Sequence, residues 1–171
     1  MADPVAKEQF RQAMKVARRP AGRLLLISFV FALLPIPFLV ADHSADPEAK
    51  AILMGLFVLS SLFLQLLSHF IAAKIGLLRS LFRAKSKYHL VDPAPPGELK
   101  PYFWRWYAYF WCGFALLIVA SIALSMVDKD GKAAGSGGLA LILFYTINLY
   151  SITGLVTRLV RDGKASFPTD S

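Results

Sequence analysis

The chain has 171 residues, of which 56% are hydrophobic, and its formal net charge is +8. Four long apolar stretches without charge are rare in a soluble domain of this length, so the composition argues against a soluble globular enzyme. The sequence predicts one all-α domain over residues 1–171. We expect an integral membrane four-helix antiparallel transmembrane bundle with two basic amphipathic interfacial helices.

The first predicted element is an amphipathic helix over residues 5–19. Phe10, Met14 and Ala17 recur at helical spacing, and basic side chains cover the opposite arc. Such a helix is expected to lie at the inner headgroup surface, where anionic lipids attract each cation by about 1 kcal/mol. A merely solvated basic tail is the alternative. The residues predicted to contact lipid headgroups here are Arg11, Lys15, Arg18 and Arg19.

The first transmembrane helix is predicted over residues 23–41. Pro20 and Gly22 are expected to break the chain before it, and Pro35 and Pro37 predict a kink near its outer end. A basic tail before an apolar run would also suit a cleaved signal peptide. The run is long for such a peptide, which favours a retained signal anchor.

The second transmembrane helix is predicted over residues 51–73, and it continues into a basic amphipathic extension over residues 74–88. The Pro- and Gly-rich segment 91–97 is expected to end this extension. The polar candidates within the second helix are Gln65, Ser68 and His69. The residues of the extension that are predicted to contact headgroups are Arg79, Arg83, Lys85 and Lys87.

The third transmembrane helix is predicted over residues 103–127. Its first part is dense in Tyr and Trp, which concentrate at the boundary between membrane and water. An aromatic cage for a cationic ligand or a quinone headgroup is the alternative. Cys112, the one cysteine of the chain, excludes an intrachain disulfide and is interpreted as a small packing residue.

The fourth transmembrane helix is predicted over residues 138–158, with polar candidates Tyr145, Asn148 and Tyr150. Together with Gln65 and His69 these side chains would suit a polar pathway through the bundle. In lipid, however, polar and small side chains also let helices approach and hydrogen-bond across their contact. We favour helix contact over a pathway.

The basic residues are divided unequally between the two sides of the expected membrane. Of the nineteen Lys and Arg residues, only Lys50, Lys129 and Lys132 fall on the side opposite the termini. Because positive charge collects in cytoplasmic flanks, we expect a multi-pass protein of the inner (plasma) membrane with cytoplasmic termini. The same distribution indicates anionic lipid rather than nucleic acid as the partner of these charges.

The sequence offers little that could carry chemistry. The predicted transmembrane helices contain no Asp or Glu, which argues against an ion-coupled carrier. A bis-histidine haem needs two facing imidazoles, and His43 and His89 fall on opposite sides of the expected membrane. Two acidic loops, 42–48 and 128–131, lack the ligand spacing of a calcium site. We therefore expect no enzyme activity, cofactor or metal site.

The leading functional hypothesis is a non-catalytic accessory, assembly or scaffold subunit of a larger inner-membrane protein complex. Its expected partners are other membrane-protein subunits or further copies of the chain. One alternative is a self-assembling small pore or transporter built around Gln65, Asn148 and Tyr150. Another is a membrane enzyme or cofactor carrier that uses His69.

Overall fold

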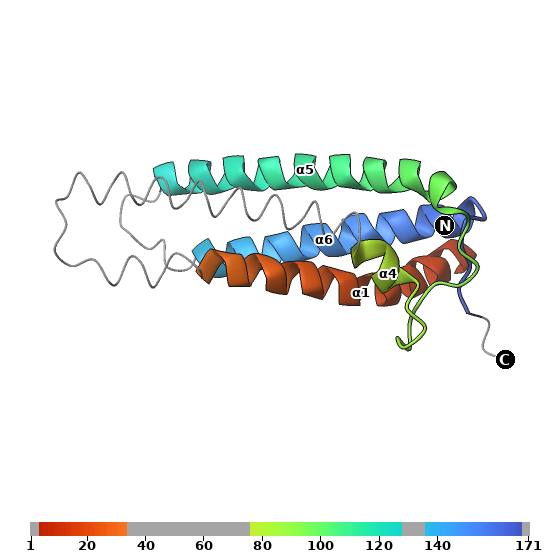
Figure 1. The fold of residues 1–171 in the computed structure, drawn as a ribbon. Helices are drawn as coiled ribbons and strands as arrows, with labels where there is room; N and C mark the ends of the chain where they lie inside the picture. Colours follow the sequence, from red (N-terminus) through yellow and green to blue (C-terminus); the bar gives the residue numbers. More distant parts are fainter. Residues whose placement is uncertain (1–3, 34–75, 128–135, 169–171) are drawn as a thin grey trace.

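The computed structural model describes residues 4–33, 76–127 and 136–168 of the chain (Figure 1). The helices in this part are α1 (Pro4–Leu33), α4 (Leu77–Leu81), α5 (Pro96–Val127) and α6 (Ser136–Arg161). The prediction of an all-α protein is confirmed, since the described residues contain helices and no β-strand.

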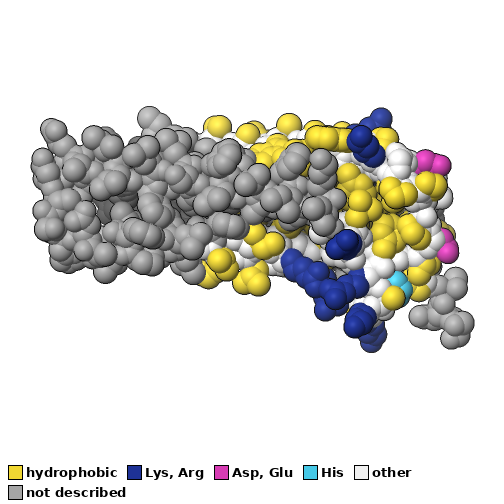
Figure 2. Space-filling view, in the orientation of Figure 1, with side chains coloured by type: hydrophobic (Ala, Val, Ile, Leu, Met, Phe, Trp, Pro, Cys, Tyr) yellow, Lys and Arg dark blue, Asp and Glu magenta, His cyan; other side chains and the backbone are white. Residues whose placement is uncertain are grey.

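The three long helices lie side by side (Figure 1). Helices α1 and α5 run in the same direction, and α6 runs back between them. Helix α6 packs against both α1 and α5, while the short α4 packs against α1. The N-terminus, α4 and the C-terminal segment lie at the same end of the molecule. We call it the charged end because its surface carries Lys, Arg, Asp and Glu side chains (Figure 2).

The predicted break at Pro20 and Gly22 is wrong, because α1 runs through both residues without interruption. A proline within a helix removes one backbone hydrogen bond and usually kinks or ends the helix. Here Pro20 is buried, as is the adjacent Ala21. The packing of this face outweighs the local preference of the proline, so residues 5–19 and the described part of the segment 23–41 belong to one helix.

The buried face of α1 differs in part from the predicted one. Phe10 is 39% exposed, whereas Ala13, Ala17 and Ala21 are each 0% exposed. These three alanines recur every four residues, and small residues at this spacing let two helix backbones approach closely. One face of α1 therefore packs within the bundle, and of the three alanines Ala17 alone belongs to the predicted apolar face.

The basic extension predicted over residues 74–88 is much shorter as a helix. Helix α4 ends at Leu81, whose carbonyl oxygen accepts a hydrogen bond from the Leu90 amide at 2.9 Å. Leu77 and Leu81 are buried in the core, which fixes this one turn against α1. Lys85 and Lys87 therefore lie in the loop after α4 and not on a helix, which corrects the prediction.

Helix α5 begins seven residues before the predicted start at residue 103. Pro96 is its first residue, a position at which the missing amide of proline costs nothing. The Pro95 carbonyl accepts hydrogen bonds from the amides of Glu98 and Leu99, at 2.9 and 3.3 Å. The Pro- and Gly-rich segment 91–97 thus starts the next helix as well as ending the preceding loop.

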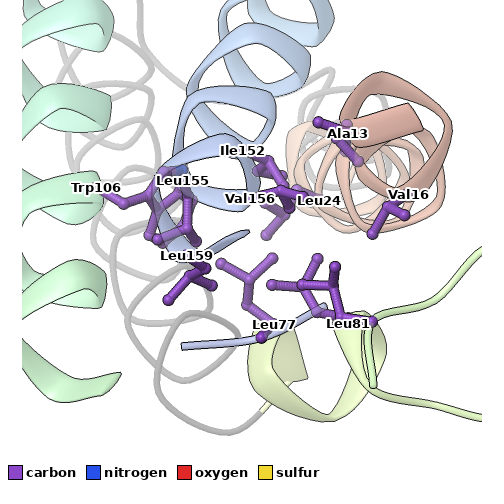
Figure 3. Close-up of a cluster of buried hydrophobic side chains, with 14 of the residues drawn as sticks. Ala13, Val16, Leu24, Leu77, Leu81, Trp106, Ile152, Leu155, Val156 and Leu159 are labelled. Carbon is purple, nitrogen blue, oxygen red and sulfur yellow. The ribbon is translucent and has the colours of Figure 1, made fainter. Parts of the chain in front are cut away.

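The core lies where α6 meets the other helices (Figure 3). Ile152 and Val156 of α6 point toward α1, and Leu77 of α4 lies beside them. On the other side of α6, Phe110 of α5 meets Phe144 edge to face, with ring centroids 6.0 Å apart. All these side chains are buried, so α6 is the central element of the described bundle.

Among the described residues, one segment is long and apolar enough to cross a membrane: Ile142–Arg161 of α6. This assignment rests on length and mean hydropathy, and the core helix of a soluble protein can meet the same criteria. The kink predicted at Pro35 and Pro37, the second transmembrane helix and both acidic outer loops lie outside the described residues.

Candidate helix-contact site

Among the described members of the predicted polar set, Asn148 is the most deeply buried. It is 0% exposed, and its Nδ2 donates a hydrogen bond to the Phe144 carbonyl one turn earlier at 2.9 Å. Within the described residues, no donor reaches its Oδ1. A buried acceptor without a donor costs free energy, so this oxygen marks a point where a further donor would stabilise the bundle.

One side-chain hydrogen bond connects α5 to α6 beside Asn148. Trp106 Nε1 donates to Ser151 Oγ at 3.2 Å, and Ser151 Oγ donates to the Asn148 carbonyl at 3.0 Å. The sequence analysis missed both Trp106 and Ser151 as contact residues. The sequence contained one indication of this contact: an indole N–H inside a helix bundle needs a hydrogen-bond acceptor, and Ser151 lies one turn from Asn148.

The threonines of α6 satisfy their hydroxyl groups within their own helix. Thr153 Oγ1 donates to the Leu149 carbonyl at 2.6 Å, and Thr157 Oγ1 donates to the Thr153 carbonyl at 2.8 Å. Thr153 is also fully buried. A hydroxyl bonded in this way leaves a compact helix surface, which suits close packing against a neighbour.

The structure does not bring Asn148 and Tyr150 to the same side of α6. Residues two positions apart point in nearly opposite directions on a helix. Accordingly Tyr150 is 56% exposed, with its ring centroid 6.5 Å from that of Phe10 on α1. Tyr145 is partly buried against the core. Gln65, Ser68 and His69 lie outside the described residues.

The predicted headgroup-binding side chains are all exposed, and they come from α1, α4 and the loop after α4. Figure 2 shows dark blue side chains gathered at the charged end. Lys15 of α1 and Lys87 of the loop approach the ring of Tyr88, with Nζ 5.5 and 6.0 Å from its centroid. These two cation–π contacts connect α1 to the loop after α4. The basic side chains of this region form one surface, which we call the basic surface: Arg11, Lys15, Arg18, Arg19, Arg79, Arg83, Lys85 and Lys87.

The segment after α6 is held against the loop before α5, and we call this arrangement the C-terminal clasp. Val91 and Ser166 exchange backbone hydrogen bonds of 2.9 and 3.0 Å, and Ser166 Oγ donates to Asp92 Oδ2 at 2.7 Å. Lys164 forms an ion pair with Glu98. The residues of the clasp lie far apart in the chain, so no local pattern could have predicted their contact.

A second polar contact of the clasp perturbs two ionisable groups. Tyr102 donates to Asp162 at 2.8 Å, and this hydrogen bond lowers the pKa of Asp162, with a further lowering from Arg161. The same hydrogen bond raises the pKa of the Tyr102 phenol. The hydrogen bond and charge of Glu98 raise the pKa of Lys164.

We expect the stability of the clasp to decline at both extremes of pH. Asp162 titrates at a lower pH when folded than when unfolded, so its contribution is present above about pH 4 and is lost as the pH falls through the lowered pKa. Lys164 contributes below about pH 10 and loses its contribution as the pH rises through its raised pKa. Thermal unfolding of purified protein across pH measures both limbs.

Two variants test these limbs. Asp162→Asn removes the titrating carboxylate and is expected to weaken the acidic decline; because the same carboxylate raises the pKa of Tyr102, this variant also weakens part of the alkaline decline. Glu98→Gln removes the carboxylate that raises the pKa of Lys164, so it is expected to weaken the alkaline decline. An acidic decline of equal size in the wild type and in Asp162→Asn would contradict this account.

The described residues contain no group of three His, Cys, Asp or Glu side chains close enough to hold a metal ion. His89, the histidine of the described part, lies with its Nδ1 2.9 Å from the Ser86 carbonyl oxygen. The candidate cofactor ligand His69 is in the part of the chain that is not described.

Comparison of the chain with protein-family models, with curated proteins and with solved structures finds no match.

Proposed function

We propose that the chain is a multi-pass protein of the inner membrane, in which a four-helix antiparallel bundle crosses the bilayer. The observation that carries this proposal is the separation of charged from apolar surface along the described helices. Lys, Arg, Asp and Glu side chains gather at the charged end, and the described part farther along shows apolar side chains (Figure 2). The exposed apolar residues come from all three long helices and include Phe29, Val30, Leu116, Val119, Ile142 and Leu143.

The degree of exposure of this apolar surface supports a hydrocarbon environment. Leu116 is 70% exposed, Val119 63% and Ile142 64%. Covering apolar surface is worth about 25 cal/mol for each Å² removed from water, so side chains in this number need a cover of lipid or protein. The sequence stretches 106–127 and 139–157 contain no charged residue, as hydrocarbon requires.

The function that fits this bundle best is that of a non-catalytic accessory, assembly or scaffold subunit. Three polar contacts support this proposal: Trp106 of α5 donates to Ser151 of α6, and Thr153 and Thr157 of α6 bond the backbone of their own helix. The exposed apolar surface suits other membrane-protein subunits or further copies of the chain as partners. The basic surface suits anionic lipid at the cytoplasmic boundary.

A small pore or transporter is the second candidate, and Asn148 is the observation that favours it. Its buried Oδ1 faces no donor among the described residues, so it is free to accept a hydrogen bond from a solute. The exposed position of Tyr150, on the opposite side of α6, weighs against a shared lining.

Thiol labelling in intact cells tests the membrane arrangement. In a Cys112→Ala background, Ala45→Cys and Ser136→Cys are expected to react with an impermeant thiol reagent, because both positions lie in predicted outer segments. Ala2→Cys and Ser171→Cys are expected to react only after the cells are opened. Labelling of the terminal pair alone in intact cells would contradict the orientation.

The same membranes distinguish a scaffold from a pore. Purification in mild detergent is expected to yield a foreign membrane subunit in fixed stoichiometry, and reconstituted chain alone is expected to give no solute flux. Selective flux from the chain alone, altered by Asn148→Ala, would overturn the scaffold proposal in favour of a pore. Thr146→Ala is the matched control, since the Thr146 hydroxyl bonds the Ile142 carbonyl of its own helix.

A further inference from the structure

A groove opens between α5 and α6 at the charged end, away from the polar contacts of Asn148. It has a volume of about 460 Å³, and its basic walls are Arg105 from α5 and Arg158 and Arg161 from α6. Tyr102, Ala108 and Tyr109 of α5 and Asp162 after α6 complete these walls. None of these lining residues belongs to the predicted polar or headgroup-binding sets.

Helical spacing explains why these side chains line one groove. Tyr102, Arg105 and Tyr109 are three and four residues apart, so they form one stripe along α5. Arg158 and Arg161 are three residues apart and lie on one side of α6. The two stripes face each other across the groove, and the guanidinium carbon of Arg158 lies 5.5 Å from the centroid of the Tyr109 ring.

The groove carries an excess of positive charge. Arg161 Nε pairs with Asp162 at 3.2 Å. Among the residues that the structure describes, Arg105 and Arg158 form no ion pair with a carboxylate. The lining holds three arginines and one carboxylate, Asp162, so the groove keeps a net positive charge. A guanidinium presents a planar fork of donors that matches two oxygens of a phosphate. The groove therefore offers two such forks to an anion.

A second hollow of about 280 Å³ continues from this groove along α6. It shares Tyr102, Arg105, Tyr109 and Arg158 with the first and is further lined by Trp106, Ser151, Gly154 and Leu155. A Cβ atom built at Gly154 would meet nothing within 4 Å, so this glycine leaves open space beside Leu155. The second hollow extends from the arginines toward the apolar part of α6. The anion-binding groove therefore has an apolar hollow beside it.

We propose that this groove binds the phosphate of an anionic glycerophospholipid, with part of an acyl chain lying in the second hollow. Basic pockets between helices on the cytoplasmic side of a membrane are suited to lipid headgroups. Arg105 and Arg158 hold the phosphate, and Gly154 leaves room for the chain. This inference rests on the proposed membrane location. A free phosphate ester has the same anionic group, but it has no acyl chain to fill the apolar hollow.

The test counts phospholipids retained by the full chain after release from nanodiscs, by native mass spectrometry. Nanodiscs of phosphatidylcholine alone are compared with nanodiscs that contain a minority of phosphatidylglycerol. We expect retention of phosphatidylglycerol in preference to phosphatidylcholine. Arg105→Gln and Arg158→Gln are each expected to lower that retention about fivefold. Gly154→Leu, which fills the hollow, is expected to lower it while the arginines remain.

Two controls separate this site from general charge and from free phosphate. The double variant Lys7→Gln/Lys100→Gln removes two exposed cations that belong neither to the groove nor to the basic surface, and it is expected to leave retention unchanged. Soluble glycerol phosphate, added in excess, is expected not to displace the lipid. Equal retention of both lipids, or equal loss in the control variant, would overturn the inference. Displacement by glycerol phosphate together with indifference to Gly154→Leu would assign the groove to a soluble phosphate ester instead.

Extraction of cell membranes with alkaline carbonate distinguishes failure of the membrane proposal from failure of the lipid-site proposal. Release of the wild-type chain by carbonate would refute the membrane proposal itself. A chain that stays in the membrane but shows no lipid preference would refute the lipid site alone.

Discussion

We expect Phe110→Ala to lower the free energy of unfolding by about 3–5 kcal/mol. Phe110 is 2% exposed and packs between Trp106, in a stacked arrangement with centroids 5.8 Å apart, and Phe144, edge to face at 6.0 Å. Its removal leaves a cavity where α5 meets α6, and the surrounding aromatic rings lose contacts whether the outer surface meets water or lipid. Unfolding of the purified protein in mixed micelles of increasing SDS content measures this loss.

Phe29→Ala is the matched control for that experiment. It removes the same ring from α1, but Phe29 is 43% exposed, so less packing is lost. The loss of stability is therefore expected to be clearly smaller than that of Phe110→Ala. Equal losses at the two positions would show that the α5–α6 aromatic contact is not packed as described.

We expect Ala17→Leu to destabilise the bundle by about 1–3 kcal/mol by forcing α1 away from its neighbours. Ala17 is 0% exposed and is central in the row formed by Ala13, Ala17 and Ala21. The larger side chain has no space on this face, and α1 packs principally against α6. Thermal unfolding in detergent measures the change, and faster proteolysis within α1 is expected to accompany it.

Ala6→Leu supplies the control, because it makes the same substitution on the same helix at an exposed position. Ala and Leu differ little in helix propensity, so this variant is expected to unfold like the wild type. If Ala17→Leu were as stable as Ala6→Leu, the alanine row would not be a close contact. The continuous α1 would then need another explanation than packing of its buried face.

The C-terminal clasp and the lipid groove meet at Tyr102 and Asp162. Both residues line the groove, and their hydrogen bond also ties the segment after α6 to the start of α5. A variant that loosens the clasp, such as Asp162→Asn, therefore also removes the one carboxylate that offsets the arginines. Substitutions at Arg105, Arg158 and Gly154 change the groove without removing this hydrogen bond, so they test the lipid site more directly.

Several features of this protein follow from the sequence alone. Long apolar stretches predicted an all-α chain, and the helices α5 and α6 cover the stretches predicted at 103–127 and 138–158. Such stretches are local properties, because a helix satisfies its backbone hydrogen bonds within one segment. The unequal distribution of Lys and Arg is likewise visible without a structure, and the proposed orientation in the membrane is based on it.

Other features were decided by tertiary contacts. Pro20 predicted a break, and the burial of its helix face against the rest of the bundle kept α1 continuous, because packing of a whole face outweighs one missing hydrogen bond. The basic segment after Leu81 had an amphipathic pattern, yet the hydrogen bond from Leu90 to Leu81 turns it into a loop. The clasp between Asp92 and Ser166 and the groove between Arg105 and Arg158 join residues far apart in the chain. Spacing along a sequence determines which side chains share one helix face, but only the packing of two helices determines which faces meet.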